Sequence, residues 1–205
     1  GYKLGANDEV EVTVYGSNLQ QTAVVRTRIK EDGTITLPLL GTVQVRDRTA
    51  RELAEQITIQ LRSGGYLVNP SVNVDVTQYV SNVVTVFGQV GTPGIYPLDR
   101  QHTVGMVVAR AGGGRSDGAD YVVLRRRGNP IEQQIAFADL TGEWSTATIV
   151  QAGDMLYVPT APVVFVYGQV NAPGSFTIRS GMTLRQILAR AGGPTAAELE
   201  DAYAI

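Results

Sequence analysis

One segment of the sequence occurs twice, and this repeat constrains the fold more than any other feature. The first copy, VFGQVGTPGIYPLDRQHTVGMVVARAGG, begins at Val86, and the second, VYGQVNAPGSFTIRSGMTLRQILARAGG, begins at Val166. The copies align without a gap and are identical at 12 of the 28 positions. A repeat of this kind indicates a duplicated structural module, so the elements predicted for one copy are also predicted for the other.

Each copy begins with the pattern of a β-hairpin. The apolar runs 83–90 and 163–170 are rich in β-branched and aromatic residues, which predicts a strand. A proline and a glycine then predict a type II turn, in which the glycine has a positive φ. Shorter second strands are predicted at 95–98 and 175–178. The turn signature, which we interpret as structural, comprises Gly88, Pro93, Gly94, Gly168, Pro173 and Gly174.

A short helix is predicted after each hairpin. Thr103 and Thr183 can cap its start, and Thr183 with Gln186 fits a capping box. Apolar residues at helical spacing follow, and a glycine pair ends each helix, where a left-handed conformation is favoured. The apolar stripes are Val104, Val107, Val108 and Ala111 in the first copy, and Leu184, Ile187, Leu188 and Ala191 in the second.

Further strands after the helix predict a β-grasp module. In the first copy they are expected at 121–127, 131–137 and 154–158. The second copy reaches Ile205 at about the position where the first of these strands would begin. We therefore expect the second copy to be incomplete in this chain, or to be completed by another segment or another chain.

Residues 1–80 predict a module of a different kind. Alternating strands are expected at 9–15 and 71–78, with another at 24–30. Asp32-Gly33 predicts a hairpin turn into residues 35–37. Thr49 and Glu52 fit a capping box before a helix with the apolar stripe Leu53, Ile57 and Leu61. The sequence thus predicts an α+β chain of three modules, residues 1–80, 81–161 and 162–205.

Composition excludes several classes of function. The net charge of −2 is evenly spread, with −1 in residues 1–80 (8 basic, 9 acidic), −1 in 81–161 (6 and 7) and 0 in 162–205 (3 and 3). This distribution lacks the basic excess of nucleic-acid-binding proteins. The chain has no cysteine, so thiolate metal sites and cysteine nucleophiles are excluded. Its apolar runs are shorter than the ~20 residues of a membrane-spanning helix.

The candidate contact residues are an arginine cluster and several aromatic residues. Arg125, Arg126 and Arg127 would alternate between the two faces of a strand. They could form an exposed strand end, an ion-paired surface between subunits, or a lining that attracts an acidic polysaccharide. Aromatic side chains can stack on sugar rings or fill a core or an interface. The aromatic residues considered are Tyr79, Tyr96, Tyr121, Trp144 and Tyr157, of which Tyr96 and Trp144 are retained as candidate contacts.

The sequence predicts no catalytic, metal or cofactor site. The single histidine, His102, is expected to be a solvated loop residue beside a helix start. Asp117 and Asp120 flank a glycine, but a calcium loop needs more oxygen ligands at fixed spacing, so a turn is predicted. The three glycines at 112–114 follow a helix, whereas a phosphate-binding loop precedes one.

The phrases of this sequence resemble a known family. GYKLGANDEVEVTVYG, EDGTITLPLLGTVQV, TARELAEQI and YLVNPSVNVDV resemble the N-terminal polysaccharide-export domain. FGQVGTPGIYPL and TVGMVVARAGG resemble an SLBB (soluble-ligand-binding β-grasp) domain, which occurs again from Val166. An export domain followed by SLBB domains is the arrangement of the outer-membrane polysaccharide export proteins, the Wza-like family. The resemblance covers nearly the whole chain.

This resemblance implies a function that composition cannot indicate. It implies a homo-oligomeric ring, octameric in well-known members, in the periplasm and outer membrane of a Gram-negative bacterium. The lumen of the ring would carry capsular polysaccharide or exopolysaccharide, with an inner-membrane polysaccharide co-polymerase, often a tyrosine autokinase, as partner. The sequence shows no lipobox cysteine and no C-terminal amphipathic helix. We therefore expect a periplasmic part of a longer protein, or a member that crosses the outer membrane by other means.

Two other functions differ in their physical requirements. A carbohydrate-binding or scaffold module that forms no channel would be monomeric, whereas ring subunits share a heterologous interface. A glycoside-cleaving enzyme needs two acids across a groove. Asp139 and Glu143 are acids of this kind, but nothing in their sequence context singles them out.

Overall fold

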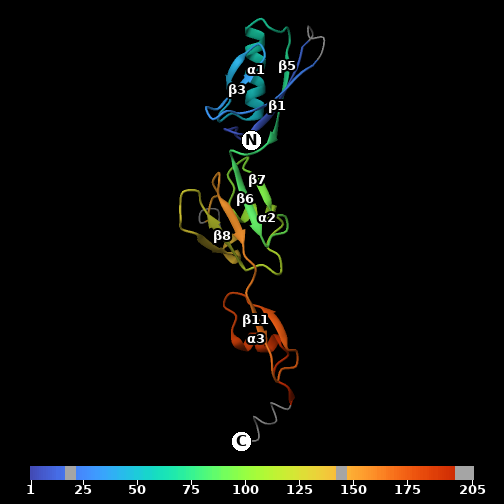
Figure 1. The fold of residues 1–205 in the computed structure, drawn as a ribbon, viewed down its shortest axis with the longest axis vertical. Coiled ribbons are helices and arrows are strands. Elements are labelled where there is room, and N and C mark those ends of the chain that lie inside the picture. Colours follow the sequence, from blue (N-terminus) through green and yellow to red (C-terminus); the bar gives the residue numbers. More distant parts are fainter. Residues whose placement is uncertain (17–21, 142–146, 197–205) are drawn as a thin grey trace.

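The computed structural model describes residues 1–16, 22–141 and 147–196. Figure 1 shows three modules that follow one another along the longest axis of the molecule, with the N-terminus beside the joint between the first two. In the part of the chain that is described, no helix combines the length and the apolar character needed to span a membrane.

The first module packs a helix and a hairpin against one face of an antiparallel sheet. The sheet has the order β2-β1-β5, and the β3-β4 hairpin is separate from it. Val10 and Val12 of β1 pack with Leu53 of the helix in one buried cluster. The Thr49–Glu52 capping box is present at the helix start, as predicted. The elements are β1 (Glu9–Tyr15), β2 (Ala23–Arg28), β3 (Thr34–Leu37), β4 (Gly41–Gln44), α1 (Ala50–Ser63) and β5 (Ser71–Gln78).

The predicted hairpin across Asp32-Gly33 is only partly correct. The chain does turn there: Gly33 has φ +81°, and its N–H donates to the Lys30 carbonyl. However, β2 pairs with β1 and β3 pairs with β4, so the two flanking strands form no ladder with each other. The pairing partner is set by the rest of the module, because the turn fixes only the local reversal of the chain.

The second module has the β-grasp topology that the sequence predicts. Its five-stranded sheet has the order β7-β6-β10-β8-β9, with β6 and β10 parallel and the other neighbours antiparallel. Val84 and Val86 of β6 are buried with Val107 of the helix. The elements are β6 (Val83–Gly88), β7 (Gly94–Pro97), α2 (Val104–Arg110), β8 (Tyr121–Arg125), β9 (Gln133–Ala136), the 3-10 helix η1 (Phe137–Thr141) and β10 (Met155–Val158).

The third module contains, in its described part, the hairpin and the helix of the same fold. These elements are β11 (Val163–Val166), β12 (Gly174–Thr177) and α3 (Leu184–Arg190). Thr183 caps α3 in a capping box with Gln186, as predicted. Leu184 is 71% exposed, whereas Val104 at the equivalent position of the second module is 1% exposed. The difference arises because segments after the helix cover Val104 in the second module.

The conformations of the signature glycines correct the predicted type II turn. Gly94 lies outside the left-handed region, and Gly174 has φ +156°, near extended backbone. The left-handed glycines are instead Gly88, with φ +88°, and Gly168, with φ +106°. A Cβ on Gly88 would lie 2.1 Å from the Val158 carbonyl oxygen, so the close approach of β10 also requires glycine there. Both predicted glycine pairs after the helices have positive φ.

Candidate functional site

The three arginines of the cluster lie in three different environments. Arg126 donates through Nε and Nη2 to the two carboxylate oxygens of Asp154, at 3.1 and 3.0 Å, and also to the Ile149 carbonyl. Asp154 is 1% exposed. A buried carboxylate needs such a partner, because an unpaired buried charge is strongly destabilising. Arg126 therefore holds the 149–154 segment against the end of β8, which is a structural role.

Arg125 and Arg127 are on the surface. Arg125 is paired with Glu132, and its Nε lies 2.9 Å from that carboxylate. Arg127 lines a groove of about 480 Å³ between the first two modules, together with Asn7 and Glu31. Among the described residues, no ion pair involves Arg127. Of the three, it is the arginine whose charge is available to a ligand or a partner.

The two aromatic candidates have different outcomes. The Tyr96 hydroxyl donates to the Thr92 carbonyl across the β6–β7 turn, and Arg110 lies 5.5 Å from the centre of its ring. These contacts connect the hairpin to α2, so Tyr96 contributes to the fold of the module. Trp144 lies outside the described residues, and so does Glu143 of the acid pair considered above. Asp139 lies on η1.

The prediction that His102 is solvated was wrong. Its side chain is 2% exposed, and Nε2 lies 2.8 Å from the Asp99 carboxylate. The hydrogen bond with His102 lowers the pKa of Asp99. The Val150 N–H donates to the His102 carbonyl, so a segment much later in the chain covers this loop. Because burial depends on this distant segment, the local sequence could not indicate it.

A buried carboxylate of the first module anchors the linker to the second. Asp8 accepts hydrogen bonds from the backbone N–H groups of Val80 and Ser81, at 2.7 and 2.8 Å, and from the Ser81 hydroxyl. The Tyr2 hydroxyl also donates to Asp8, and burial raises the pKa of Tyr2. Hydrogen bonds to a charged acceptor are stronger than neutral ones, so this joint is fixed.

The second and third modules are joined by two further polar contacts. Asp120 accepts hydrogen bonds from the backbone N–H and the hydroxyl of Ser180, at 2.8 and 2.7 Å. These bonds lower the pKa of Asp120. Arg179 donates to the Gly118 carbonyl and, at 2.7 Å, to the Ser116 carbonyl. The segment considered for calcium is therefore a turn that docks the third module, and the described residues contain no cluster of three metal-ligating side chains.

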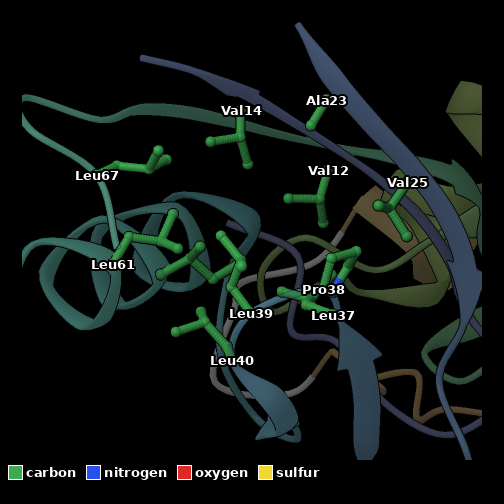
Figure 2. A pocket seen from close by; sticks show the side chains of 11 residues that line it. Val12, Val14, Ala23, Val25, Leu37, Pro38, Leu39, Leu40, Leu61 and Leu67 are labelled. Atoms are coloured by element: carbon green, nitrogen blue, oxygen red, sulfur yellow. The ribbon is translucent and has the colours of Figure 1, made fainter. Parts of the chain in front are cut away.

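Figure 2 shows a small apolar cavity in the first module, between the sheet, α1 and the turn after β3. Its volume is about 60 Å³, and only apolar side chains line it. Leu39 lies at its rim with φ +71° and 57% of its surface exposed. Small-molecule sites have volumes of roughly 300–1,000 Å³, so this cavity is too small for a sugar ring.

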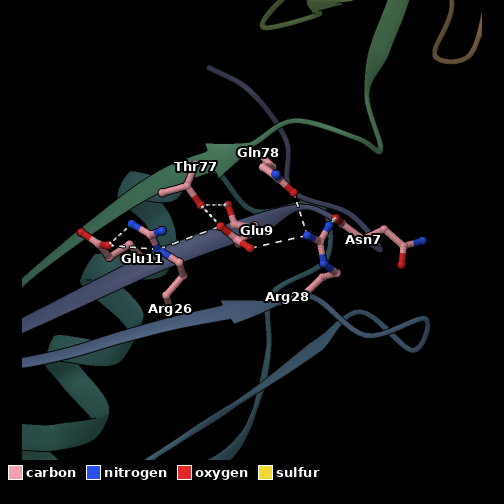
Figure 3. Close-up of polar contacts among 7 residues, drawn as sticks. All are labelled: Asn7, Glu9, Glu11, Arg26, Arg28, Thr77 and Gln78. Carbon is pink, nitrogen blue, oxygen red and sulfur yellow. Dashed lines mark hydrogen bonds and ion pairs between the residues drawn. The ribbon is translucent and has the colours of Figure 1, made fainter.

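The outer face of the β2-β1-β5 sheet carries a polar network (Figure 3). Arg28 donates to Gln78 at 2.7 Å and lies 3.5 Å from Glu9, while Arg26 lies 2.9 Å from Glu11. Opposite charges thus face each other across β1 and β2. Exposed pairs of this kind contribute little to stability, and here they neutralise each other's charge. The face offers hydrogen-bond donors and acceptors without a strong field of either sign.

Comparison with known proteins identifies the family of the chain. Residues 1–77 match the family described as polysaccharide biosynthesis/export protein, and residues 83–134 and 163–203 match the SLBB domain. The chain belongs to the polysaccharide export protein family. In this chain the export domain comes first and the two SLBB segments follow it, as the sequence phrases predicted.

Individual relatives agree with this assignment. The EPS I polysaccharide export outer membrane protein EpsA of Ralstonia solanacearum is 29% identical over 185 residues, which is 86% of this chain and 48% of EpsA. The capsule polysaccharide export protein BexD of Haemophilus influenzae is 27% identical over 80% of this chain and 42% of its own length. The exopolysaccharide production protein ExoF of Rhizobium meliloti is 31% identical over 55% of this chain and 28% of ExoF. The chain thus spans about half, or less, of the length of these relatives.

Sequence reasoning missed the residues that join the modules. Asp8 and Asp120 are acids in polar segments, and their hydrogen-bond partners lie 72 or 73 and 60 residues away. The available signal was the shortness of both joints, which favours modules in a fixed line. That signal gives no indication of which side chains form the contacts.

Proposed function

We propose that this chain is a periplasmic and outer-membrane component of a machine that exports capsular polysaccharide or exopolysaccharide. The observation that carries the proposal is one chain with an export domain and two SLBB segments, similar to relatives named as polysaccharide export proteins. Its role is passive, because it forms part of the wall of a channel for the polysaccharide and neither forms nor breaks covalent bonds. Synthesis and an inner-membrane polysaccharide co-polymerase supply the direction of transport.

The proposed assembly is a homo-oligomeric ring, and we expect it to be an octamer. The hydrogen-bonded joints support it, because subunits with a fixed shape can repeat one heterologous contact around a closed ring. We propose module boundaries near residues 80 and 161, close to the limits of the two buried clusters. Arg125 and Arg127 remain the candidate contacts with polysaccharide or a neighbouring subunit, because Arg126 is held by Asp154.

Two measurements test this proposal. Deleting the gene should stop the appearance of polysaccharide outside the cell while synthesis inside continues, and the wild-type gene should restore export. Native mass measured over a concentration series should give a discrete multiple of the subunit mass, which is 21.9 kDa for this chain. The full-length protein in detergent should likewise give a discrete multiple of its own subunit mass. Restored export by a full-length protein that is monomeric at every concentration would refute the ring and favour a binding or scaffold module without a channel.

A further inference from the structure

The outer face of the second module's sheet carries a cleft of about 280 Å³. Side chains alternate along each strand, so the face opposite α2 presents the residues between the buried ones. On β6, for example, Val84 and Val86 are buried and Phe87 faces outward. The residues lining the cleft are Phe87, Val123, Arg125, Glu132, Met155 and Tyr157.

One wall of this cleft is aromatic and fixed in place. Phe87 and Tyr157 are paired in the parallel register of β6 and β10, and their rings stack with centroids 4.8 Å apart and an interplanar angle of 26°. Each is still 37% exposed. A Cβ on Gly88 would lie 2.7 Å from Cε2 of Tyr157, so the glycine allows this ring to lie over β6. The pair therefore presents a preformed apolar surface to solvent.

The opposite side of the cleft is polar, and its two charged side chains form an ion pair with no net charge. Arg125 on β8 is paired with Glu132, and their side chains are 61% and 45% exposed. The guanidinium retains N–H donors and the carboxylate retains acceptor sites beyond this pair. Val123 and Met155 complete the lining. The cleft thus places an apolar ring surface near a closely spaced donor and acceptor.

We propose that this cleft binds one neutral pyranose unit of the exported polysaccharide. This assignment rests on the function proposed above. The C–H face of a pyranose packs on an aromatic ring, and its hydroxyls both donate and accept hydrogen bonds, which suits Arg125 and Glu132. The volume is slightly below the range of small-molecule sites, so it holds a single ring and binds weakly. Weak binding suits a polymer that must move on.

The sequence repeat retains an aromatic residue at the position of Phe87. Tyr167 is the equivalent of Phe87 in the second copy of the repeat. It is 73% exposed, and its ring is parallel within 4° to that of Phe165, at a centroid distance of 6.3 Å. Val164 and Val166 alternate with these aromatic residues and are only partly buried. Both copies therefore direct an aromatic side chain away from the helix, where it contributes little to a core.

Met155 provides a direct reporter of the cleft. The chain has three methionines, and Met106 on α2 is an internal control outside the cleft. Protein labelled with ¹³C at the methionine methyl groups is titrated with cellohexaose, a neutral oligosaccharide, and with hexagalacturonate, an anionic one. We expect the Met155 methyl resonance to shift saturably with cellohexaose, with a Kd of about 1 mM, while Met106 stays unchanged.

Substitutions then locate the contact. Tyr157→Leu should weaken cellohexaose binding at least tenfold, whereas Tyr66→Leu, at an exposed tyrosine of the first module, should leave it unchanged. Arg125→Gln provides a second test in which the aromatic wall stays intact. An unchanged Met106 resonance shows that each variant is folded.

Three results would overturn the cleft proposal. These are no shift of Met155 with cellohexaose, tighter binding of hexagalacturonate, and a Met155 shift that follows protein concentration without sugar, which would mark a contact between copies. Complementation of a strain that lacks the gene distinguishes failure of the cleft proposal from failure of the proposed function. If wild type restores export but Met155 does not respond, the cleft proposal fails alone. If wild type does not restore export, the proposed function fails.

Discussion

The equivalent glycines of the two copies allow a matched test of why the repeat needs glycine. Gly88 and Gly168 both have positive φ, so alanine at either position incurs about 1–2 kcal/mol of backbone strain. Only Gly88 also faces another backbone, because its Cβ would lie 2.1 Å from the Val158 carbonyl oxygen. That oxygen accepts a hydrogen bond from the Gln89 N–H, so it cannot move freely. Forcing atoms apart in a packed site costs about 1–3 kcal/mol more.

We therefore expect Gly88→Ala to lower the stability of the second module by about 2–5 kcal/mol. Gly168→Ala should cost the third module only about 1–2 kcal/mol, because nothing lies within 4 Å of its Cβ. Hydrogen exchange measured by mass spectrometry assigns each loss to its module. Backbone amides that exchange only when their module opens should report the loss of stability directly. For Gly88→Ala their exchange should accelerate roughly 30-fold to several thousand-fold in β6 and β10. For Gly168→Ala it should accelerate about 5- to 30-fold in β11 and β12. Equal losses, or a larger loss for Gly168→Ala, would refute the argument from the close approach of β10.

Three further predictions follow from the buried and joining contacts. Arg126→Ala removes the ion-pair partner of buried Asp154, which keeps a hydrogen bond from the Gln151 N–H. The change should destabilise the second module by up to about 3–5 kcal/mol in urea unfolding, whereas Arg127→Ala should stay within about 0.5 kcal/mol; similar losses would contradict the structural role of Arg126. Asp8→Ala removes the acceptor at the first joint and should broaden the distribution of shapes in small-angle scattering, while Asp75→Ala, at an exposed acid, should leave it unchanged. The folded pKa of Asp120 is lowered, so its contribution is present above its unfolded pKa of about 3.9 and is lost as pH falls through the folded value. Scattering recorded in steps from pH 7 to well below the unfolded pKa of about 3.9 should therefore show progressive loosening of the second joint, with a smaller change in Asp120→Asn. An equal change in that variant would exclude Asp120 as its cause.

Local signals in the sequence were sufficient to predict the helices and their limits. Thr49, Thr103 and Thr183 all cap helices because a hydroxyl needs only the N–H groups of the next turn as partners. The apolar stripe of α1 is buried as its spacing predicts. The β-grasp order followed from the succession of hairpin, helix and strands, since few topologies accommodate that succession.

Features that depend on distant segments could not be predicted in this way. His102 is buried by residues near Val150, and Arg126 is held by Asp154, 28 residues later. The sequence predicted a positive φ at Gly94, because proline-glycine is a strong local turn signal. In the structure the glycine with positive φ in this hairpin is Gly88. Contact residues such as Phe87 and Tyr157 become neighbours only when β6 and β10 pair. Sequence reasoning considered Tyr157 as one aromatic among several, without its partner.

The two copies also separate what the repeat itself determines from what its surroundings add. The glycines that end the helices have φ values of 82° and 73° in the second module and 78° and 73° in the third, so both copies of the repeat form the same helix end. Burial is different: Val107 is 0% exposed and its equivalent Ile187 is 8% exposed, while Leu184 is largely exposed. The repeated phrase thus specifies a hairpin–helix unit, and the three later strands supply much of the buried surface that stabilises it. In the third module the contacts of Ser180 with Asp120 and of Arg179 with the second module partly replace that support. Loosening the second joint should therefore lower the stability of the third module more than that of the second.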